Sequence, residues 1–162
     1  MTNWIPPEGF LTSFFSNSEE ETFSLGRRIA ARLVRETNCV IALGGELGSG
    51  KTILTKGIAS GLGITETITS PTYTIINEYR QPGDSNPAFY HIDAYRLAGD
   101  EDFIQIGGRE ILDSTGISVI EWSERIEKSL PQNAIYITIE ITGPSSRTIN
   151  VKGLHLEPGL LV

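Results

Sequence analysis

A glycine-rich stretch in the first third of the chain has the residue types and spacing of a phosphate-binding loop. It follows the pattern glycine, four residues, glycine, lysine, threonine and consists of Gly45, Glu46, Leu47, Gly48, Ser49, Gly50, Lys51 and Thr52. In such a loop, glycines let backbone amides turn inward around phosphate oxygens. The lysine reaches the terminal phosphates, and the threonine hydroxyl ligates a magnesium ion that bridges them. The pattern therefore predicts a nucleotide-binding loop, with an ordinary glycine-rich turn as the alternative.

The residues on both sides of the loop fit the structural context that this motif requires. Residues 39–43 form a short apolar run suited to a buried strand. After the loop, apolar residues recur at helical spacing at Ile53, Leu54, Ile58 and Leu62. The predicted order is strand, loop, helix, and the start of the helix adds its partial positive charge to the phosphate site.

Two carboxylates are candidates for the acidic side of the site. Asp93 follows the apolar run 89–92, and Glu121 follows the apolar run 117–120. Acidic groups at the carboxyl ends of strands face the ligand crevice of α/β folds, where they hold the metal ion or its waters. We expect one carboxylate to bind Mg²⁺ and the other to orient or deprotonate the attacking water. The sequence does not divide these roles, and for either residue the alternative is a solvated carboxylate at a strand end.

Several other side chains have a possible role in the site. Ser70 and Thr72 could form a switch that senses the terminal phosphate, or simply a helix-to-strand turn. His91 suggests a core or hydrogen-bonding role rather than a metal site, because the chain has only one other histidine. Trp122 suggests packing. Three arginines are possible phosphate or partner contacts, with a surface position as the simplest interpretation: Arg96, Arg109 and Arg147.

The order of predicted elements indicates an α/β fold with a mixed sheet. A capping pattern at residues 18–21 predicts a helix that runs to about Thr37. The extended segments that end at Tyr79 and at Tyr95 are separated by the turn-rich residues 81–87, too few for a crossover helix, so the two strands pair antiparallel. We predict a three-layer P-loop NTPase fold. Short helices are expected at 100–105, 109–113 and 123–130, and further strands at 116–122, 135–141 and 147–152.

Size and composition favour a single domain at residues 18–153, with an N-terminal extension at 1–17 and a C-terminal tail at 154–162. The net charge of −7 disfavours autonomous, non-specific nucleic-acid binding. The single cysteine excludes an internal disulfide. The chain lacks both a membrane-length apolar run and a signal layout, so a cytoplasmic protein without membrane partners is expected.

Four motifs together resemble the TsaE family, also called YjeE. They are the loop at 45–52, Ser-Pro-Thr-Tyr at 70–73, His-Ile-Asp-Ala-Tyr-Arg at 91–96 and Ile-Glu-Trp at 120–122. Their order and spacing make the resemblance much more specific than the phosphate loop alone. It extends from about Glu20 to Lys152, which is nearly the whole chain.

The resemblance implies an ATPase needed for threonylcarbamoyladenosine (t6A) modification of tRNA, with ATP and Mg²⁺ as cofactors. Proteins of this kind bind the TsaB–TsaD pair, use ATP hydrolysis to allow repeated turnover, and meet tRNA only through that complex. Thr52 and Glu121 match the family's magnesium positions, Lys51 matches its phosphate lysine, and Asp93 matches the acid of its His-x-Asp-x-Tyr-Arg motif. The candidate metal ligands are therefore Thr52, Glu121 and Asp93, and the candidate catalytic residues Lys51, Asp93 and Glu121. We expect ATPase activity that is weak alone and stimulated by the partners.

Other functions use the same phosphate-binding loop. A small-molecule kinase is the main alternative, although the chain lacks an evident arginine-rich lid. A nucleotide-sensing module without catalysis is a second alternative. A GTPase is disfavoured because the chain contains no Asn-Lys-x-Asp segment for reading guanine.

Overall fold

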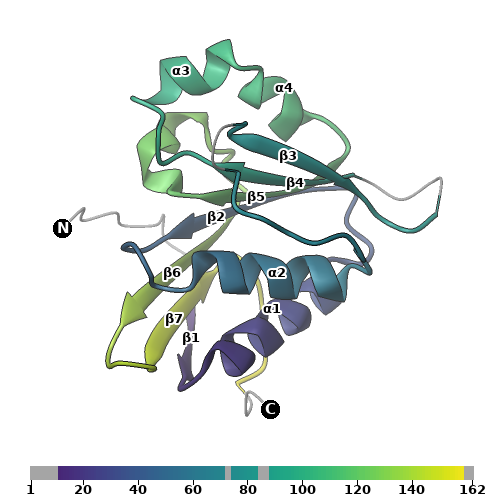
Figure 1. The fold of residues 1–162 in the computed structure, drawn as a ribbon. Coiled ribbons are helices and arrows are strands. Elements are labelled where there is room, and N and C mark those ends of the chain that lie inside the picture. The colour runs from purple at the N-terminus through teal and green to yellow at the C-terminus, as the bar shows by residue number, and fades with distance from the viewer. Residues whose placement is uncertain (1–10, 72–73, 84–87, 159–162) are drawn as a thin grey trace.

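The computed structural model describes residues 11–71, 74–83 and 88–158, shown in Figure 1. The N-terminal half contains β1 Leu11–Ser16, α1 Glu19–Leu33, β2 Asn38–Gly44, α2 Lys51–Gly61, β3 Ile76–Arg80 and β4 Ala88–Asp93. The C-terminal half contains α3 Asp100–Gln105, α4 Gly108–Asp113, β5 Gly116–Glu121, the 3₁₀ segment η1 Ser123–Ser129, β6 Ile135–Ile141 and β7 Arg147–Lys152.

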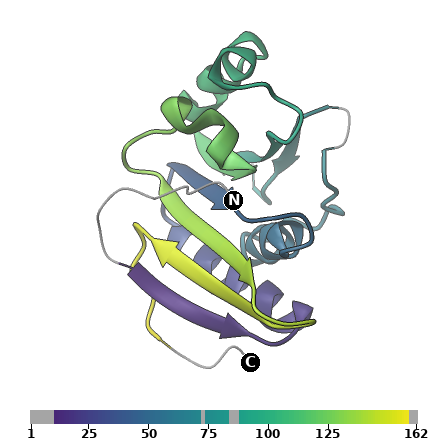
Figure 2. The same cartoon turned by 90° about the vertical axis from the view of Figure 1, so that its left-hand side faces the viewer.

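The strands form one seven-stranded mixed sheet in the order β1-β7-β6-β2-β5-β4-β3. The inner strands β6, β2, β5 and β4 run parallel, whereas β3, β7 and β1 join the two edges by antiparallel pairing. Figure 2 shows β1 and β7 side by side, with α1 and α2 behind them. The parallel centre brings the carboxyl ends of β2, β4 and β5 to the same edge, where ligands bind in such folds.

Helices cover the two faces of the sheet and make three layers. Alternate residues of β2 belong to opposite sides: Ile41 and Leu43 pack with α1 and α2, while Val40 and Ala42 pack with α3, α4 and η1. Since successive side chains of a strand point to opposite faces, a strand buried on both faces has a continuous apolar sequence. The three-layer P-loop fold with a mixed sheet is therefore confirmed.

Two glycines allow the backbones of α1 and α2 to approach each other closely. A Cβ on Gly57 would lie 2.1 Å from the Phe23 carbonyl oxygen, and a Cβ on Gly26 would lie 2.5 Å from the Leu54 oxygen. Any side chain at these crossing points would force the two helix backbones apart. The position of α2, and with it the position of the loop that precedes it, depends on this contact.

Several predicted boundaries differ from the structure. The sheet begins at Leu11, inside the stretch expected to be an N-terminal extension, because β1 pairs with β7 along its whole length. Leu156 is buried in the core, so the expected tail packs at least to that point. The first helix ends at Leu33 rather than near Thr37. Residues 123–129 form 3₁₀ turns with a kink at Ile126.

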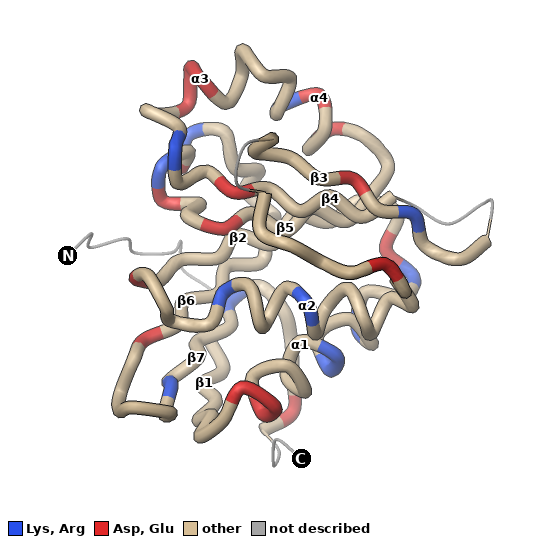
Figure 3. The backbone as a smooth tube through the Cα atoms, viewed as in Figure 1, with Lys and Arg blue, Asp and Glu red and all other residues tan. Residues whose placement is uncertain are grey.

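Other expectations hold closely. β3 and β4 pair antiparallel, as the short connection required. Ser18 caps α1 by accepting a hydrogen bond from the Glu21 amide at 3.1 Å. In Figure 3, acidic residues lie at the start of α1 and basic residues toward its end, which complements the helix dipole. Among the described helices, none combines the length and apolar character that crossing a bilayer requires.

Candidate functional site

The glycine-rich loop connects the end of β2 to the start of α2, as predicted. Gly48 and Gly50 have left-handed backbone angles, with φ of 75° and 109°, which a residue with a side chain adopts only under strain. Arg147 at the start of β7 holds the loop from outside, because its guanidinium donates to the Ser49 oxygen at 2.9 Å and the Gly48 oxygen at 3.2 Å. Its role is therefore more specific than the surface position expected for it.

Lys51 is buried and folds back onto the loop. Its Nζ donates to the carbonyl oxygens of Gly45 at 2.5 Å and Glu46 at 2.9 Å, and it lies 4.1 Å from the centre of the Trp122 ring. Burial lowers the pKa of Lys51, although nearby carboxylates, Glu121 foremost, oppose this shift. The ammonium is thus held at the loop by backbone oxygens and an aromatic face.

Glu121 is almost fully buried and accepts hydrogen bonds from two elements. Thr52 Oγ1 lies 3.0 Å from Oε1 and 3.2 Å from Oε2, and His91 Nε2 lies 2.8 Å from Oε1. The Ser70 hydroxyl extends this network, at 3.2 Å from the Thr52 hydroxyl. The hydrogen-bonding role predicted for His91 is confirmed. Ser70 lies beside the loop helix, whereas Thr72, the other predicted switch residue, lies outside the described residues.

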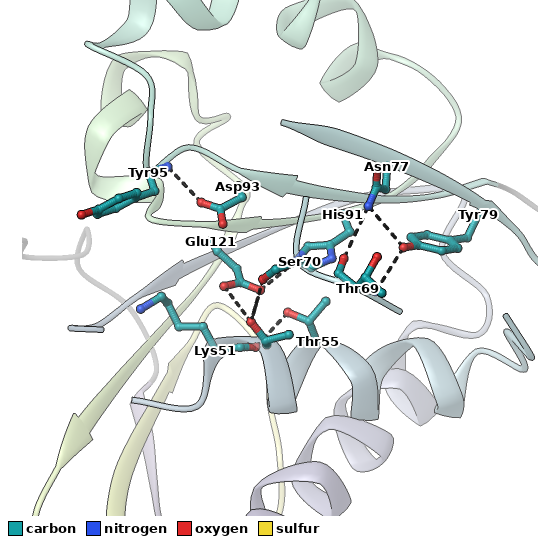
Figure 4. A network of polar contacts seen from close by, with 11 residues as sticks. Lys51, Thr55, Thr69, Ser70, Asn77, Tyr79, His91, Asp93, Tyr95 and Glu121 are labelled. Carbon is teal, nitrogen blue, oxygen red and sulfur yellow. Dashed lines mark hydrogen bonds and ion pairs between the residues drawn. The ribbon is translucent and has the colours of Figure 1, made fainter. Parts of the chain in front are cut away.

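Asp93 lies directly across from Glu121 in the β4–β5 pairing, so the two predicted acids are neighbours. Figure 4 shows both near Lys51 at the same end of the sheet. Asp93 Oδ1 accepts a hydrogen bond from the Tyr95 amide at 2.9 Å. Burial is the main cause of a raised Asp93 pKa, only partly opposed by that hydrogen bond.

Two features of the site were missed or underestimated from the sequence. The carboxylate of Glu124 in η1 interacts electrostatically with the Lys51 ammonium, and burial raises the Glu124 pKa. Its Oε2 is buried and has no hydrogen-bond partner in the described part of the chain. Trp122, predicted as packing, has a left-handed backbone (φ 58°) and presents its ring to the Lys51 ammonium. Both features depend on the 3₁₀ segment that follows Glu121, whereas the sequence predicted an ordinary helix at 123–130.

The oxygen atoms beside the loop are suited to magnesium. Within the described ranges no group of three or more His, Cys, Asp or Glu side chains could hold a metal by itself. Mg²⁺ prefers hard oxygen ligands and keeps several waters, with one or two protein ligands and substrate phosphates completing its shell. The Thr52 hydroxyl and the Glu121 carboxylate, already adjacent at 3.0 Å, are a donor pair of that kind.

A pocket of about 160 Å³ opens beside the loop. It lies where the start of α1, the loop and the β6–β7 turn meet. Its walls are formed by Ser18, Glu19, Thr22, Gly48, Ser49, Gly50, Ile53, Pro144, Ser145 and Arg147. The loop therefore borders both the Lys51 site and a separate recess large enough for part of a small ligand.

Comparison with known proteins agrees with this architecture. Residues 16–149 match the family described as Threonylcarbamoyl adenosine biosynthesis protein TsaE. The chain is 41% identical over 136 residues to "tRNA threonylcarbamoyladenosine biosynthesis protein TsaE" of Treponema pallidum, covering 84% of this chain and 96% of that protein. It is 39% identical over 130 residues to the protein of the same name from Bacillus subtilis, covering 80% and 78%.

A solved structure shares the fold as well. The crystal structure of Bacillus subtilis YdiB superposes with a TM-score of 0.71 at 33% sequence identity, covering 90% of this chain and 86% of that one. The matches extend over the loop, both acids and the surrounding sheet. The chain belongs to the TsaE family of threonylcarbamoyl adenosine biosynthesis proteins.

Proposed function

We propose that this protein binds ATP with Mg²⁺ and hydrolyses it slowly, in support of t6A modification of tRNA by the TsaB–TsaD complex. One observation carries the proposal: the Thr52 hydroxyl and the Glu121 carboxylate meet at 3.0 Å beside the buried Lys51 of a phosphate-binding loop. A phosphate cradle, a cation and a magnesium ligand pair are the parts that nucleotide hydrolysis requires. The names of the related TsaE proteins supply the pathway.

Lys51 is the phosphate ligand in this scheme. When a triphosphate enters the loop, its oxygens take the place of the Gly45 and Glu46 carbonyls as partners of the Lys51 ammonium. Thr52 and Glu121 would hold the magnesium ion, which would supply positive charge to the phosphate oxygens. The 160 Å³ pocket beside the loop is the place we assign to the nucleoside, since the same glycines border it.

Asp93 is our candidate for the group that orients the attacking water and accepts its proton. It lies beside Glu121 at the sheet edge, and in the described part of the chain the hydrogen bond that it accepts comes from the Tyr95 backbone amide. Its pKa is raised by burial, so its carboxylate is a stronger base than an exposed aspartate. Glu121, by contrast, is already engaged by Thr52 and His91.

The charge of the site supports a partner-stimulated enzyme. Four acidic side chains act on Lys51: Glu121, Glu124, Asp93 and Glu46. The nearby guanidiniums of Arg125 and Arg147 donate to backbone oxygens of Leu97 and Ser49. A cation that stabilises the transferring phosphoryl group is worth about 10³ to 10⁵ in rate when a partner supplies it. We therefore expect slow hydrolysis by the isolated protein and faster hydrolysis with TsaB–TsaD.

The test is multi-turnover t6A formation with TsaB, TsaD, tRNA and ATP, together with ATP hydrolysis, for wild type and Lys51→Ala. Loss of a preorganised charge donor typically costs about 10²- to 10³-fold, so both rates should fall by that order. Lys56→Ala is the matched control, because Lys56 lies on the same helix α2 outside the loop. An unchanged rate in Lys51→Ala, or hydrolysis by wild type that is fast and indifferent to TsaB–TsaD, would contradict the proposal.

A further inference from the structure

His91 is a fully buried histidine on β4 whose ring contacts the acid of the neighbouring strand. Its side chain has no exposed surface, and its Nε2 lies 2.8 Å from Glu121 Oε1. An ionised carboxylate only accepts hydrogen bonds, so Nε2 is the donor in this pair. The ring therefore donates a hydrogen bond to the Glu121 oxygen from strand β4, whereas Thr52 donates to it from helix α2.

The hydrogen bonds around Glu121 have a defined direction. Thr52 has one hydroxyl proton, and it points to the Glu121 carboxylate, so the Ser70 hydroxyl must donate to the Thr52 oxygen. Glu121 is thus held between a helix and a strand by two donors that share the oxygen Oε1. If Thr52 Oγ1 bound a metal ion instead, the donor from His91 would still hold the Glu121 carboxylate.

The other ring nitrogen of His91 destabilises the fold at this core position. Its Nδ1 is buried and has no hydrogen-bond partner among the described residues. A buried polar atom without a hydrogen-bond partner destabilises the folded state, and an apolar side chain of similar size would avoid this loss. Packing alone does not account for a histidine here, whereas the bond to Glu121 does.

We propose that His91 is a positioning residue that fixes the Glu121 carboxylate in the orientation needed to receive the magnesium–nucleotide complex. This inference rests on the proposed function, since it assigns His91 to the same Mg²⁺ and ATP site. Side chains that orient a metal ligand commonly change metal affinity by 10- to 100-fold when replaced. His91 should accordingly affect the part of nucleotide binding that depends on Mg²⁺ and leave the rest unchanged.

The experiment measures ATP affinity by calorimetry with Mg²⁺ and with EDTA, for wild type, His91→Leu and His91→Gln. The leucine variant removes the donor, whereas glutamine carries an amide donor at a similar distance from the backbone. We expect equal affinities in EDTA for all three proteins. The gain in affinity on adding Mg²⁺ should fall about tenfold or more in His91→Leu, and His91→Gln should recover most of it.

The outcomes separate this inference from the function on which it rests. A wild-type protein that gains no affinity from Mg²⁺ overturns both. If wild type binds ATP more tightly with Mg²⁺ and His91→Leu shows the same increase, only the positioning role is overturned. The same holds if His91→Leu loses ATP affinity equally with Mg²⁺ and with EDTA, which would indicate a structural role alone. Circular dichroism and thermal melting check each variant. Should His91→Leu fail to fold, His91→Asn, whose amide is too short to reach Glu121, takes its place with the same expected loss.

Discussion

The two halves of the site differ in how their polar groups are satisfied. In the half that we propose to bind magnesium, called the magnesium half, the Glu121 carboxylate receives donors from Thr52 on a helix and His91 on a strand, and Ser70 bonds to Thr52. In the lysine half, the Lys51 ammonium bonds to carbonyl oxygens of the loop itself. Beside it, Glu124 Oε2 is buried and has no partner in the described ranges.

Under the proposed function, this difference indicates which half would change on nucleotide binding. The magnesium half already has the arrangement that its proposed function needs, so little reorganisation is expected there. In the lysine half, a bound phosphate would have to replace the carbonyl oxygens as the partner of Lys51. Two exposed side chains belong to this half too: Leu47 of the loop is 80% exposed, and Tyr95, whose ring contacts Trp122, is 51% exposed. A partner protein that covered them would therefore act on the lysine half.

The largest expected effect comes from a change beneath both halves. Lys51 and Thr52 begin α2, and α2 is seated on α1 where a Cβ at Gly57 would lie 2.1 Å from the Phe23 carbonyl oxygen. Backbone atoms at both sides of the contact cannot rotate away, so Gly57→Ala should cost about 3 kcal/mol. For a chain of this size, the melting temperature should fall by about 6–12 °C. Nucleotide binding should weaken with and without Mg²⁺.

Gly99→Ala is the control for this variant. Nothing lies within 4 Å of a Cβ at Gly99, and its backbone is extended, so the loss should stay below about 1 kcal/mol. Differential scanning calorimetry of the two variants makes the comparison. Equal melting temperatures would show that the helix crossing does not set the position of α2, and a defect confined to Mg²⁺-dependent binding would show that the halves do not share this support.

The sequence predicted the sheet well where a local rule applied. The connection at residues 81–87 is too short for a crossover helix, so the strands on either side of it had to pair antiparallel. The alternation of apolar and polar residues over 135–141 predicted a strand. β1 was missed because the apolar residues of this segment, Leu11, Phe14 and Phe15, do not alternate with polar ones, and the segment becomes a strand through its pairing with β7. Such non-local pairing has no signature within the segment itself.

For the site, the motif residues were found and their connections were not. Thr52, Glu121 and Asp93 follow from the loop and from acids at strand ends, and the register of β4 with β5 explains why the acids meet. The fold-back of Lys51 onto Gly45 and Glu46 and the approach of Trp122 depend on side-chain conformation and on a left-handed backbone at Trp122. Trp122 carries no glycine-like signal for that conformation.

An intermediate effect is expected from the aromatic contact in the lysine half. Lys51 Nζ lies 4.1 Å from the Trp122 ring centre, and a cation–π contact of this kind contributes about 0.5–1 kcal/mol. Trp122→Leu removes a partner with which phosphate has to compete for the ammonium. ATP affinity in EDTA should therefore rise about two- to fivefold, by calorimetry, while the added gain from Mg²⁺ stays as in wild type.

Tyr95→Leu is the matched variant for the aromatic test. The Tyr95 ring packs against Trp122 in a tilted arrangement, 4.9 Å between centroids, but the close contact with the ammonium is made by Trp122. Its affinity for ATP in EDTA should remain within twofold of wild type. Weaker ATP binding by Trp122→Leu would mean that the indole stabilises the bound state. It would contradict the inference that the lysine half must change to bind phosphate.

The smallest effect concerns stability and separates the two acids. Burial raises the Asp93 pKa above its ordinary value of 3.8, so the folded protein holds this proton to higher pH than the unfolded chain. The cost of ionising Asp93 is therefore absent below pH 3.8 and grows as pH rises through the folded-state pKa.

Asp93→Asn keeps an oxygen for the Tyr95 amide, so at pH 7 its melting temperature should exceed that of wild type by about 1–3 °C, a gain that shrinks toward pH 4. Glu121→Gln should show no such gain, because the Glu121 carboxylate is stabilised by Thr52 and His91. Melting curves between pH 4 and 7 test this, and a pH-independent gain in Asp93→Asn would rule out ionisation as its cause.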